Sequence, residues 1–329
     1  MSNKIYIGAM TGTSHDAVDV SFIKVGKEIT LEYFHTKKIS KPLRQKIKNL
    51  IESNESSLSD LGSLNKEIGY FFAKAINEAI SLSSSKKSEI ASIAISGQTV
   101  RHEVNTKYPF SMQIGDPNIV AKETGILVVS DFRNMHIALG GEGAPLVPEF
   151  HNQLFHKPRY PRIILNIGGI ANYSYIKNKK AIWGSDVGPG NALLDSYCND
   201  FLGIAFDKGG AIAAKGKVDA NELKQLLANN FFKKRFPKST GKEVFNIKIL
   251  SKRFLKKKPE DILCTLVEFS ARAIVNAIMK NKHKKSEIIV CGGGANNKYL
   301  LKRISEIANN NVKTSNALGY DIFAIESMA

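Results

Sequence analysis

Apolar residues in the first part of the chain recur with the period of a β-strand. Val18, Val20 and Phe22 alternate with polar residues after a turn that begins at Gly12, and a further β-rich run covers residues 29–34. The spacing predicts a β-hairpin followed by a third strand. A Walker-type phosphate loop leads from a strand into a helix, so a turn that leads into another strand does not fit that motif.

Helical spacing replaces this pattern in the next segment. Residues 42–51 and 58–82 carry apolar positions three and four apart, which predicts two amphipathic helices that cover a sheet. The apolar run 90–95 and the run 125–130, which ends at Asp131, predict two further strands.

The second half of the chain begins the same order of elements again. The stretch RIILNIGGIANYSYI predicts a strand, a glycine turn and a strand from Arg162, and residues 181–185 predict the next strand. A helix is expected at 259–279, with Pro259 in its first turn, and the strand 288–291 leads into three glycines. A weak internal repeat is therefore visible, and strands mixed with crossover helices predict α/β layers in each half.

The length of the chain indicates how many lobes it forms. The chain has 329 residues, and because a single core stops growing at about 250–300 residues we expect two lobes, residues 1–150 and 151–329, with a cleft between them.

The net charge of +17 suggests nucleic acid or an anionic membrane as a partner. The lysines are dispersed along the sequence, however, which favours a solvated surface and argues against a nucleic-acid face.

The cysteines and the N-terminal residues indicate in which cellular compartment the protein is expected. Cys198, Cys264 and Cys291 are too far apart for a disulfide framework or a thiolate zinc site, and are expected to be buried thiols. Residues 1–7 lack the basic region and apolar run of an export signal, and no uninterrupted apolar stretch is long enough to span a bilayer. We therefore expect a cytoplasmic protein.

Glycine-rich turns at the ends of predicted strands are the candidate ligand sites. The turn Gly12–Asp19 offers backbone N–H groups, hydroxyls and carboxylates to an anion or, through water, to a metal ion; an ordinary polar hairpin tip is the alternative. The clusters Gly168-Gly169, Gly188–Gly190 and Gly292–Gly294 permit the close backbone approach that a nucleotide needs. Four such turns in two repeated halves point to phosphates held between the lobes.

Polar residues that follow predicted strands could carry the chemistry. Asp186 could accept a proton from a hydroxyl or from water, although capping of the next turn explains it equally well. The Asp131–Arg133 segment would present an arginine to a polar or anionic substrate group, with an ion pair inside the lobe as the alternative. His102, His136 and His151 are unevenly spaced, predict no metal site, and are expected to be surface or hydrogen-bonded residues.

Eight motifs in register make the chain resemble the anhydro-N-acetylmuramic acid kinase family, from about residue 5 to the C-terminus. These motifs are GAMTGTSHDAVDV, SGQTVRH, MQIGDPNIVAKETGILVVSDFR, GGEGAPLVPEFHNQLF, LNIGGIANYSYI, GSDVGPGNALLDSYC, FPKSTGKEVFN and CGGGANNKYL. The family is part of the sugar kinase, Hsp70 and actin superfamily. The resemblance therefore implies an α/β fold of two ribonuclease-H-like lobes, the actin-like ATPase fold, with ATP in the cleft between them.

The resemblance also implies a reaction, and a role for particular residues. An enzyme of this family opens 1,6-anhydro-N-acetylmuramic acid with water and phosphorylates it with ATP, giving N-acetylmuramic acid 6-phosphate in peptidoglycan recycling. Asp186 matches the catalytic aspartate, which takes a proton from the attacking water. The residues implied for ATP and Mg²⁺ are Gly12, Thr13, Ser14, His15, Asp16 (also the metal contact), Ala17, Val18, Asp19, Gly168, Gly169, Gly292 and Gly293. Those expected to contact the sugar are Gln98, Asp131, Arg133 and Asn166. The family precedent is a homodimer.

Five positions depart from the family pattern: Ala17, Ser96, Val104, His136 and Val187. Ala17 matters most, because an added Cβ in a phosphate turn is harmless at negative φ and costly at positive φ. The chain also ends where family members usually continue a terminal helix, so we expect that element to be shortened. The alternatives are a related sugar kinase that acts on another hexose derivative and, outside enzymes, an ATP-dependent binding switch of the actin or Hsp70 type.

Overall fold

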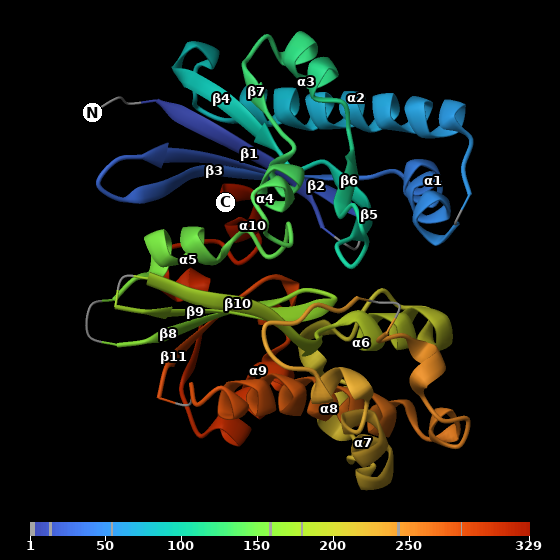
Figure 1. The fold of residues 1–329 in the computed structure, drawn as a ribbon. Helices are drawn as coiled ribbons and strands as arrows, with labels where there is room; N and C mark the ends of the chain where they lie inside the picture. The colour runs from blue at the N-terminus through green and yellow to red at the C-terminus, as the bar shows by residue number, and fades with distance from the viewer. Residues whose placement is uncertain are drawn as a thin grey trace. The chain divides into compact units, whose positions relative to one another are not determined.

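The structure, a computed structural model, consists of two compact units that are described separately. It describes residues 4–12, 15–53, 55–157, 160–178, 180–241, 244–283 and 285–329. Unit 1 comprises residues up to Leu146 together with Phe323–Ala329, and unit 2 comprises Val147–Ile322 (Figure 1).

Unit 1 is built on a mixed five-stranded sheet in the order β3-β2-β1-β4-β7. Strand β1 pairs antiparallel with β2 and parallel with β4, and β2 pairs antiparallel with β3, so the predicted hairpin and third strand are confirmed. Strands β5 and β6 form a separate two-stranded ribbon. The elements of unit 1 are β1 (Ile5–Thr11), β2 (Ala17–Val25), β3 (Ile29–Lys38), α1 (Lys41–Glu52), α2 (Leu58–Leu82), β4 (Ile90–Ile95), β5 (Gln98–Glu103), β6 (Phe110–Ile114), α3 (Pro117–Thr124), β7 (Val128–Val129), α4 (Phe132–Ala138) and α10 (Ile325–Met328).

The long helix α2 covers one face of this sheet. Its apolar stripe includes Phe72 and Ile76, and the alternating side chains Val18, Val20 and Phe22 of β2 belong to the same buried cluster. All five are fully buried, which explains why the strand period of β2 and the helical period of α2 could both be seen in the sequence.

The opposite face of the same sheet is covered by α10, which contacts β1 and β2. Gly8 faces Ser21 across the β1–β2 ladder, and the Ser21 hydroxyl lies 2.6 Å from that of Ser327. A Cβ on Gly8 would stand 1.8 Å from the carbonyl oxygen of Ser327, so only glycine permits this close approach. Residues 323–329 therefore pack in unit 1, whereas the sequence division assigned them to the second lobe.

Unit 2 repeats the architecture with a five-stranded sheet in the order β10-β9-β8-β11-β12. Strand β8 pairs antiparallel with β9 and parallel with β11, β9 pairs antiparallel with β10, and β11 pairs parallel with β12. Order and directions match those of unit 1, so the internal repeat is confirmed. The elements are α5 (Pro148–Phe155), β8 (Arg162–Ile167), β9 (Ile170–Lys177), β10 (Lys180–Pro189), α6 (Ala192–Tyr197), α7 (Ala220–Leu227), α8 (Pro259–Lys280), β11 (Glu287–Cys291), α9 (Lys298–Ala308) and β12 (Val312–Thr314).

Helix α8 is the central helix of the unit 2 core. It is the one helix among the described residues that is long and apolar enough to cross a membrane, with a mean hydropathy of 1.6 over its most apolar window. Because 83% of that window is buried inside the protein, its apolar character is accounted for by packing. The charged exception is Glu268, which is buried on α8 and pairs with Arg272 and Arg303.

Two predicted strands have different bounds in the structure. Strand β7 covers only Val128–Val129 of the expected 125–130, because Gly125 ends helix α3 in a left-handed conformation with φ 62°. Strand β10 is longer than the expected 181–185 and continues through Asp186 to Pro189.

Candidate functional site

The hairpin turn of unit 1 lies between Thr11 and Val18, the last paired residues of β1 and β2. Thr13 and Ser14, two of the predicted phosphate-binding residues, lie outside the described residues. The backbone N–H of His15 donates to the carbonyl oxygen of Gly12 at 3.1 Å, which closes the turn. Asp16, the predicted metal contact, is exposed at the end of this turn.

The remaining residues of that motif, Ala17–Asp19, belong to strand β2. The side chain of Val18 is fully buried in the core, and Asp19 accepts a hydrogen bond of 2.7 Å from Thr36 on β3. Ala17 pairs with Lys38 as ordinary extended backbone, so its Cβ causes no backbone strain. Of the described residues of this motif, Gly12, His15 and Asp16 therefore lie in the turn, outside the paired strands.

Gln98 lies at the same end of the unit 1 sheet as the hairpin turn. The Thr11 hydroxyl donates to Gly97 at 3.2 Å, and the Ser96 N–H donates to Ala9 at 3.1 Å. Gln98 is only 2% exposed; its Nε2 donates to Thr99, while its Oε1 has no hydrogen-bond partner in the part of the chain that the structure describes. A buried amide oxygen without a donor is unfavourable, so this atom is a candidate acceptor for a ligand hydroxyl or amide.

Arg133 is held on helix α4 by the loop that follows the helix. Its Nη1 donates to the carbonyl oxygen of Gly143 at 2.8 Å, and Gly143 N–H donates to Nδ1 of His136 at 3.0 Å. Burial lowers the pKa of Arg133, and the negative charge of Glu326 on α10 acts against that shift. His136, a departure from the family pattern, therefore helps to shape the loop that positions Arg133.

Two further residues flank this arginine. Asp131 begins α4 in a left-handed conformation with φ 63° and accepts a hydrogen bond from Asn134. His102 on β5 lies 3.0 Å from the Ser111 hydroxyl; burial, with the charge of Arg133 as the second cause, lowers the pKa of its imidazole. His102 is thus a hydrogen-bonded residue, as expected.

In unit 2, two of the predicted glycine turns lie at neighbouring strand ends. Strands β8 and β11 are parallel, with Asn166 opposite Cys291, so the turn at Gly168-Gly169 and the turn at Gly292 leave the same edge of the sheet. Gly292 has φ 79°, and a Cβ there would stand 2.3 Å from Oδ1 of Asn166. The structure therefore brings together these glycines, Gly293 and Asn166.

The third glycine cluster of this unit packs against the first. The backbone N–H of Gly190 donates to Gly169 at 2.9 Å, and that of Asn191 donates to Gly168 at 2.8 Å. A Cβ on Gly190 would stand 2.3 Å from the carbonyl oxygen of Gly168. At least part of the glycine content here thus serves backbone packing around the candidate nucleotide site.

Asp186 lies within strand β10, which forms one edge of the unit 2 sheet. The sequence placed it directly after a strand; the strand instead continues past it through a bulge between Asp186 and Gly188, where Val187 is buried. The carboxylate is half-buried, and its Oδ2 accepts hydrogen bonds from Thr240 N–H at 2.9 Å and Ser239 Oγ at 3.2 Å.

The segment that reaches Asp186 lies in the FPKSTGKEVFN motif, and nothing in the sequence indicates a role for it at the site. No periodicity marks residues 238–240, and only the register of the fold brings them to β10. Glu326, whose charge acts on Arg133, was likewise missed, because the sequence division placed it in the second lobe.

Histidines and cysteines do not assemble a metal site in the described ranges, where no group of three or more His, Cys, Asp or Glu side chains could hold an ion. His151 is 1% exposed and lies 2.9 Å from the Ser174 hydroxyl, and burial lowers its pKa to about 3. The three cysteines are free and buried, as predicted.

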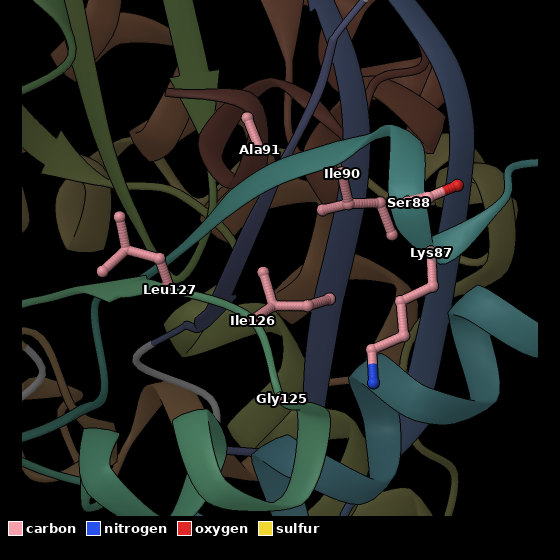
Figure 2. Close-up of a pocket in the computed structure, with 7 residues that line it drawn as sticks. All are labelled: Lys87, Ser88, Ile90, Ala91, Gly125, Ile126 and Leu127. Atoms are coloured by element: carbon pink, nitrogen blue, oxygen red, sulfur yellow. The ribbon is translucent and has the colours of Figure 1, made fainter.

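Figure 2 shows a pocket in unit 1 that lies apart from these residues. The pocket lies beside the first residues of β4 and the residues that precede β7. Gln98 and the hairpin turn lie beyond the other end of β4. The pocket is therefore not part of the candidate site. Its lining residues are Lys87, Ser88, Ile90, Ala91, Gly125, Ile126 and Leu127.

Comparison with known sequences matches the chain to a family over almost its whole length. The profile described as anhydro-N-acetylmuramic acid kinase matches residues 4–329. A relative of that name from Gamma-proteobacterium EBAC31A08 is 73% identical over 329 residues, which cover 100% of this chain and 90% of the relative. Another of the same name, from Shewanella amazonensis, is 41% identical over 335 residues, with the same coverage of both chains.

Solved structures of other proteins have a similar fold. The activator of the 2-hydroxyisocaproyl-CoA dehydratase from Clostridium difficile with bound ADPNP has a TM-score of 0.53 at 12% identity and covers 98% of this chain and 91% of its own. Component A of the (R)-2-hydroxyglutaryl-CoA dehydratase from Acidaminococcus fermentans has a TM-score of 0.52 at 15% identity, with 99% of both chains covered. At such low identity these likenesses show the fold alone, and they agree with the predicted pair of repeated α/β lobes.

Proposed function

The chain belongs to the anhydro-N-acetylmuramic acid kinase family, and from this premise we propose that it uses ATP to open and phosphorylate 1,6-anhydro-N-acetylmuramic acid. The product is N-acetylmuramic acid 6-phosphate, and the pathway is peptidoglycan recycling. The single observation that carries the proposal is the whole-chain match at 73% identity, which extends through every motif assigned above.

Asp186 is the proposed general base. It accepts a proton from water as the water oxygen bonds to the anomeric carbon, and the bond from that carbon to the bridging oxygen breaks. The released oxygen on carbon 6 bonds to the γ-phosphorus of ATP, and ADP leaves. Water, sugar and ATP are thus converted into one phosphorylated sugar and ADP, with the proton on Asp186 passing to solvent.

Sugar recognition is assigned to Gln98, Asp131, Arg133 and Asn166. Two observations support the first and third of these. The buried Oε1 of Gln98 lacks a donor within the described ranges, which a sugar hydroxyl or acetamido N–H would supply. The half-buried guanidinium of Arg133 gives one of its five N–H donors to Gly143, and a carboxylate such as the lactyl group of the substrate would compensate its charge.

ATP is assigned to the hairpin turn of unit 1 and to Gly168, Gly169, Gly292 and Gly293 of unit 2. The positive-φ conformation of Gly292 and its approach to Asn166 fit a site where backbone comes close to a ligand. Mg²⁺, when bound with ATP, would neutralise phosphate charge, and the exposed carboxylate of Asp16 is the proposed contact, directly or through water. Positioning and charge neutralisation supply most of the catalysis in phosphoryl transfer.

The experiment that tests this function follows both halves of the reaction at once. The purified protein is incubated with ATP, Mg²⁺ and the anhydro sugar in ¹⁸O-labelled water. We expect a 6-phosphorylated sugar with the label on its anomeric oxygen, and ADP formed one for one with it. Sugar-independent ATP hydrolysis would favour a binding switch, and phosphorylation of another hexose in preference to the anhydro sugar would favour a related kinase.

The role of Asp186 is tested by Asp186→Asn, which keeps the size of the side chain and removes its basicity. We expect turnover to fall by about 100-fold or more with little change in ATP affinity, because the base acts only in the chemical step. Turnover close to that of the wild type would reject Asp186 as the base.

The setting proposed for this reaction is a cytoplasmic homodimer. The family resemblance supports the dimer, and the three free, buried cysteines agree with a reducing compartment. Light scattering of the purified protein would decide the oligomeric state, and fractionation of cells would decide the location.

A further inference from the structure

Asp186 is contacted by a short segment of unit 2 that is distant in sequence. The Asp186 N–H donates to Lys238 O at 3.0 Å, and Oδ2 of its side chain accepts from Thr240 N–H and Ser239 Oγ. Residues 238–240 therefore bind both the backbone and the carboxylate of one residue. Because β10 is an edge strand, this segment takes the place of a neighbouring strand at that point.

Ser185 binds residues 238–240 to strand β10 through hydrogen bonds with Lys238. Its side chain is 1% exposed, its Oγ accepts from Lys238 N–H at 2.8 Å, and the same oxygen lies 3.0 Å from Lys238 O. A buried hydroxyl with both a donor and an acceptor on one residue fixes the distance between the segment and β10.

The side chain of Lys238 binds the same segment to Phe231 and Phe236. Its Nζ donates to Phe231 O at 2.9 Å and lies 4.0 Å from the centre of the Phe231 ring and 4.4 Å from that of Phe236. Aromatic faces attract a cation, so the ammonium is bound although it is partly withdrawn from water. Burial, with the charges of Lys280 and Lys234 as further causes, lowers the pKa of Lys238 to about 8.

We propose that Lys238 and Ser185 are positioning residues for Asp186, acting through residues 238–240, and this inference rests on the proposed function of Asp186 as the base. The segment holds Oδ2 with two donors and so fixes the plane of the carboxylate relative to β10. The orientation of a base affects the rate strongly, because displacement by about 1 Å can reduce the rate 100-fold.

The test compares Lys238→Met, Lys238→Arg and Ser185→Ala with the wild type, and uses Lys233→Met as a matched control on an exposed lysine nearby. We expect kcat to fall by about 10- to 100-fold in Lys238→Met and Ser185→Ala, while KM for ATP stays within about twofold. Lys238→Arg keeps a cation over the rings and should recover most of kcat. Lys233→Met should behave as the wild type.

A second measurement separates positioning from a general loss of structure. Each substitution is repeated in the Asp186→Asn background, where a positioning residue has no base left to orient. We expect Lys238→Met and Ser185→Ala to leave the residual turnover of Asp186→Asn unchanged, since residues that act as one unit are not additive. A loss of folded enzyme would instead reduce that residual turnover by the same factor as in the wild type.

Several outcomes would overturn the inference. Wild-type kcat in Lys238→Met, or equal losses with and without Asp186, would reject a positioning role. If the wild-type protein itself showed no sugar-dependent consumption of ATP, or if Asp186→Asn kept full turnover, the proposed function would fall and this inference with it. The two failures are distinguishable because the second is measured without any change at Lys238 or Ser185.

Discussion

Acidification should destabilise unit 2 through a histidine buried among aromatic rings. His283 is 9% exposed, stacks on Tyr175 with ring centres 3.6 Å apart, and lies with Nδ1 3.2 Å from the Tyr173 hydroxyl. Burial, with the charge of Lys177 as a second cause, lowers its pKa to about 4. The imidazole is therefore neutral in the folded protein at neutral pH.

The sign and size of the effect follow from proton linkage. In the unfolded chain a histidine has a pKa near 6.5, so between pH 6.5 and 4 the unfolded state binds more protons than the folded state. Above pH 6.5 His283 does not lower the free energy of unfolding. As the pH falls from 6.5 to 4 the free energy of unfolding decreases, and below pH 4 it decreases no further on account of His283. From pH 8 to pH 5 the loss is about 2 kcal/mol, and the limiting loss is about 3 kcal/mol.

The single tryptophan of the chain makes this effect measurable in unit 2 by itself. Trp183 lies in the same cluster, 5.6 Å from the His283 ring centre, so its fluorescence reports on this region during urea unfolding. The free energy of unfolding is measured at pH 8 and pH 5 for the wild type and for His283→Phe. We expect the wild type to lose about 2 kcal/mol more than the variant between the two pH values.

The comparison of slopes does not depend on the stability of the variant at neutral pH. Other groups that titrate in this range, including the buried His151, are present in both proteins and cancel. Equal pH dependence in wild type and His283→Phe would refute the reasoning, because it would mean that His283 binds its proton equally in the folded and unfolded states.

Three further substitutions test packing around the candidate site and the cores. Gly8→Ala places a Cβ 1.8 Å from Ser327 O and should destabilise unit 1 by about 1–3 kcal/mol, with faster proteolysis of α10; Gly26→Ala, whose Cβ would meet Glu28 O at 3.8 Å, is the control. Equal proteolysis of the two variants would reject this account of how α10 docks. Gly292→Ala should raise KM for ATP more than Gly319→Ala. Both glycines have positive φ, so both substitutions strain the backbone, but only a Cβ on Gly292 would approach Asn166. Identical KM values in the two variants would argue against a nucleotide contact at Gly292. Glu268→Ala should lower the unfolding free energy of unit 2 by about 1–3 kcal/mol, since it removes the charged hydrogen bonds from Arg272 and Arg303, while Glu268→Met should cost less in thermal unfolding. A larger loss in Glu268→Met would contradict this.

The sequence predicted those features that local spacing determines. The hairpin at Gly12, the helix over 58–82 and the helix beginning at Pro259 were predictable because their apolar periods match the buried faces that they form. The internal repeat could be seen only weakly in the sequence, but it is complete in the order and direction of the strands of the two sheets. The α/β class of each lobe therefore followed from the pattern, whereas the actin-like ATPase fold was implied by the family resemblance.

Features that depend on contacts distant in sequence could not be predicted in the same way. Strand β10 was expected to stop before Asp186 because the glycines that follow suggested a turn, whereas a bulge carries the strand past it. The packing of residues 323–329 in unit 1 and the binding of Thr240 to Asp186 join positions with no shared periodicity. The turns at Gly168-Gly169 and Gly292 were located correctly, whereas Gly188 and Pro189 of the third cluster belong to strand β10. The proximity of the first two turns could be seen only from the register of β8 and β11.

The position of α10 has a consequence for the order in which the chain acquires its structure. Because synthesis proceeds from the N-terminus, β1 and β2 emerge from the ribosome about 300 residues before the helix that covers them. Until translation reaches that helix, the nascent first unit exposes the face around Gly8 and Ser21, even after all of unit 2 has been made. Ribosome-bound chains stalled before residue 323 should therefore have an unfinished N-terminal half, although every residue of unit 2 has already been synthesised.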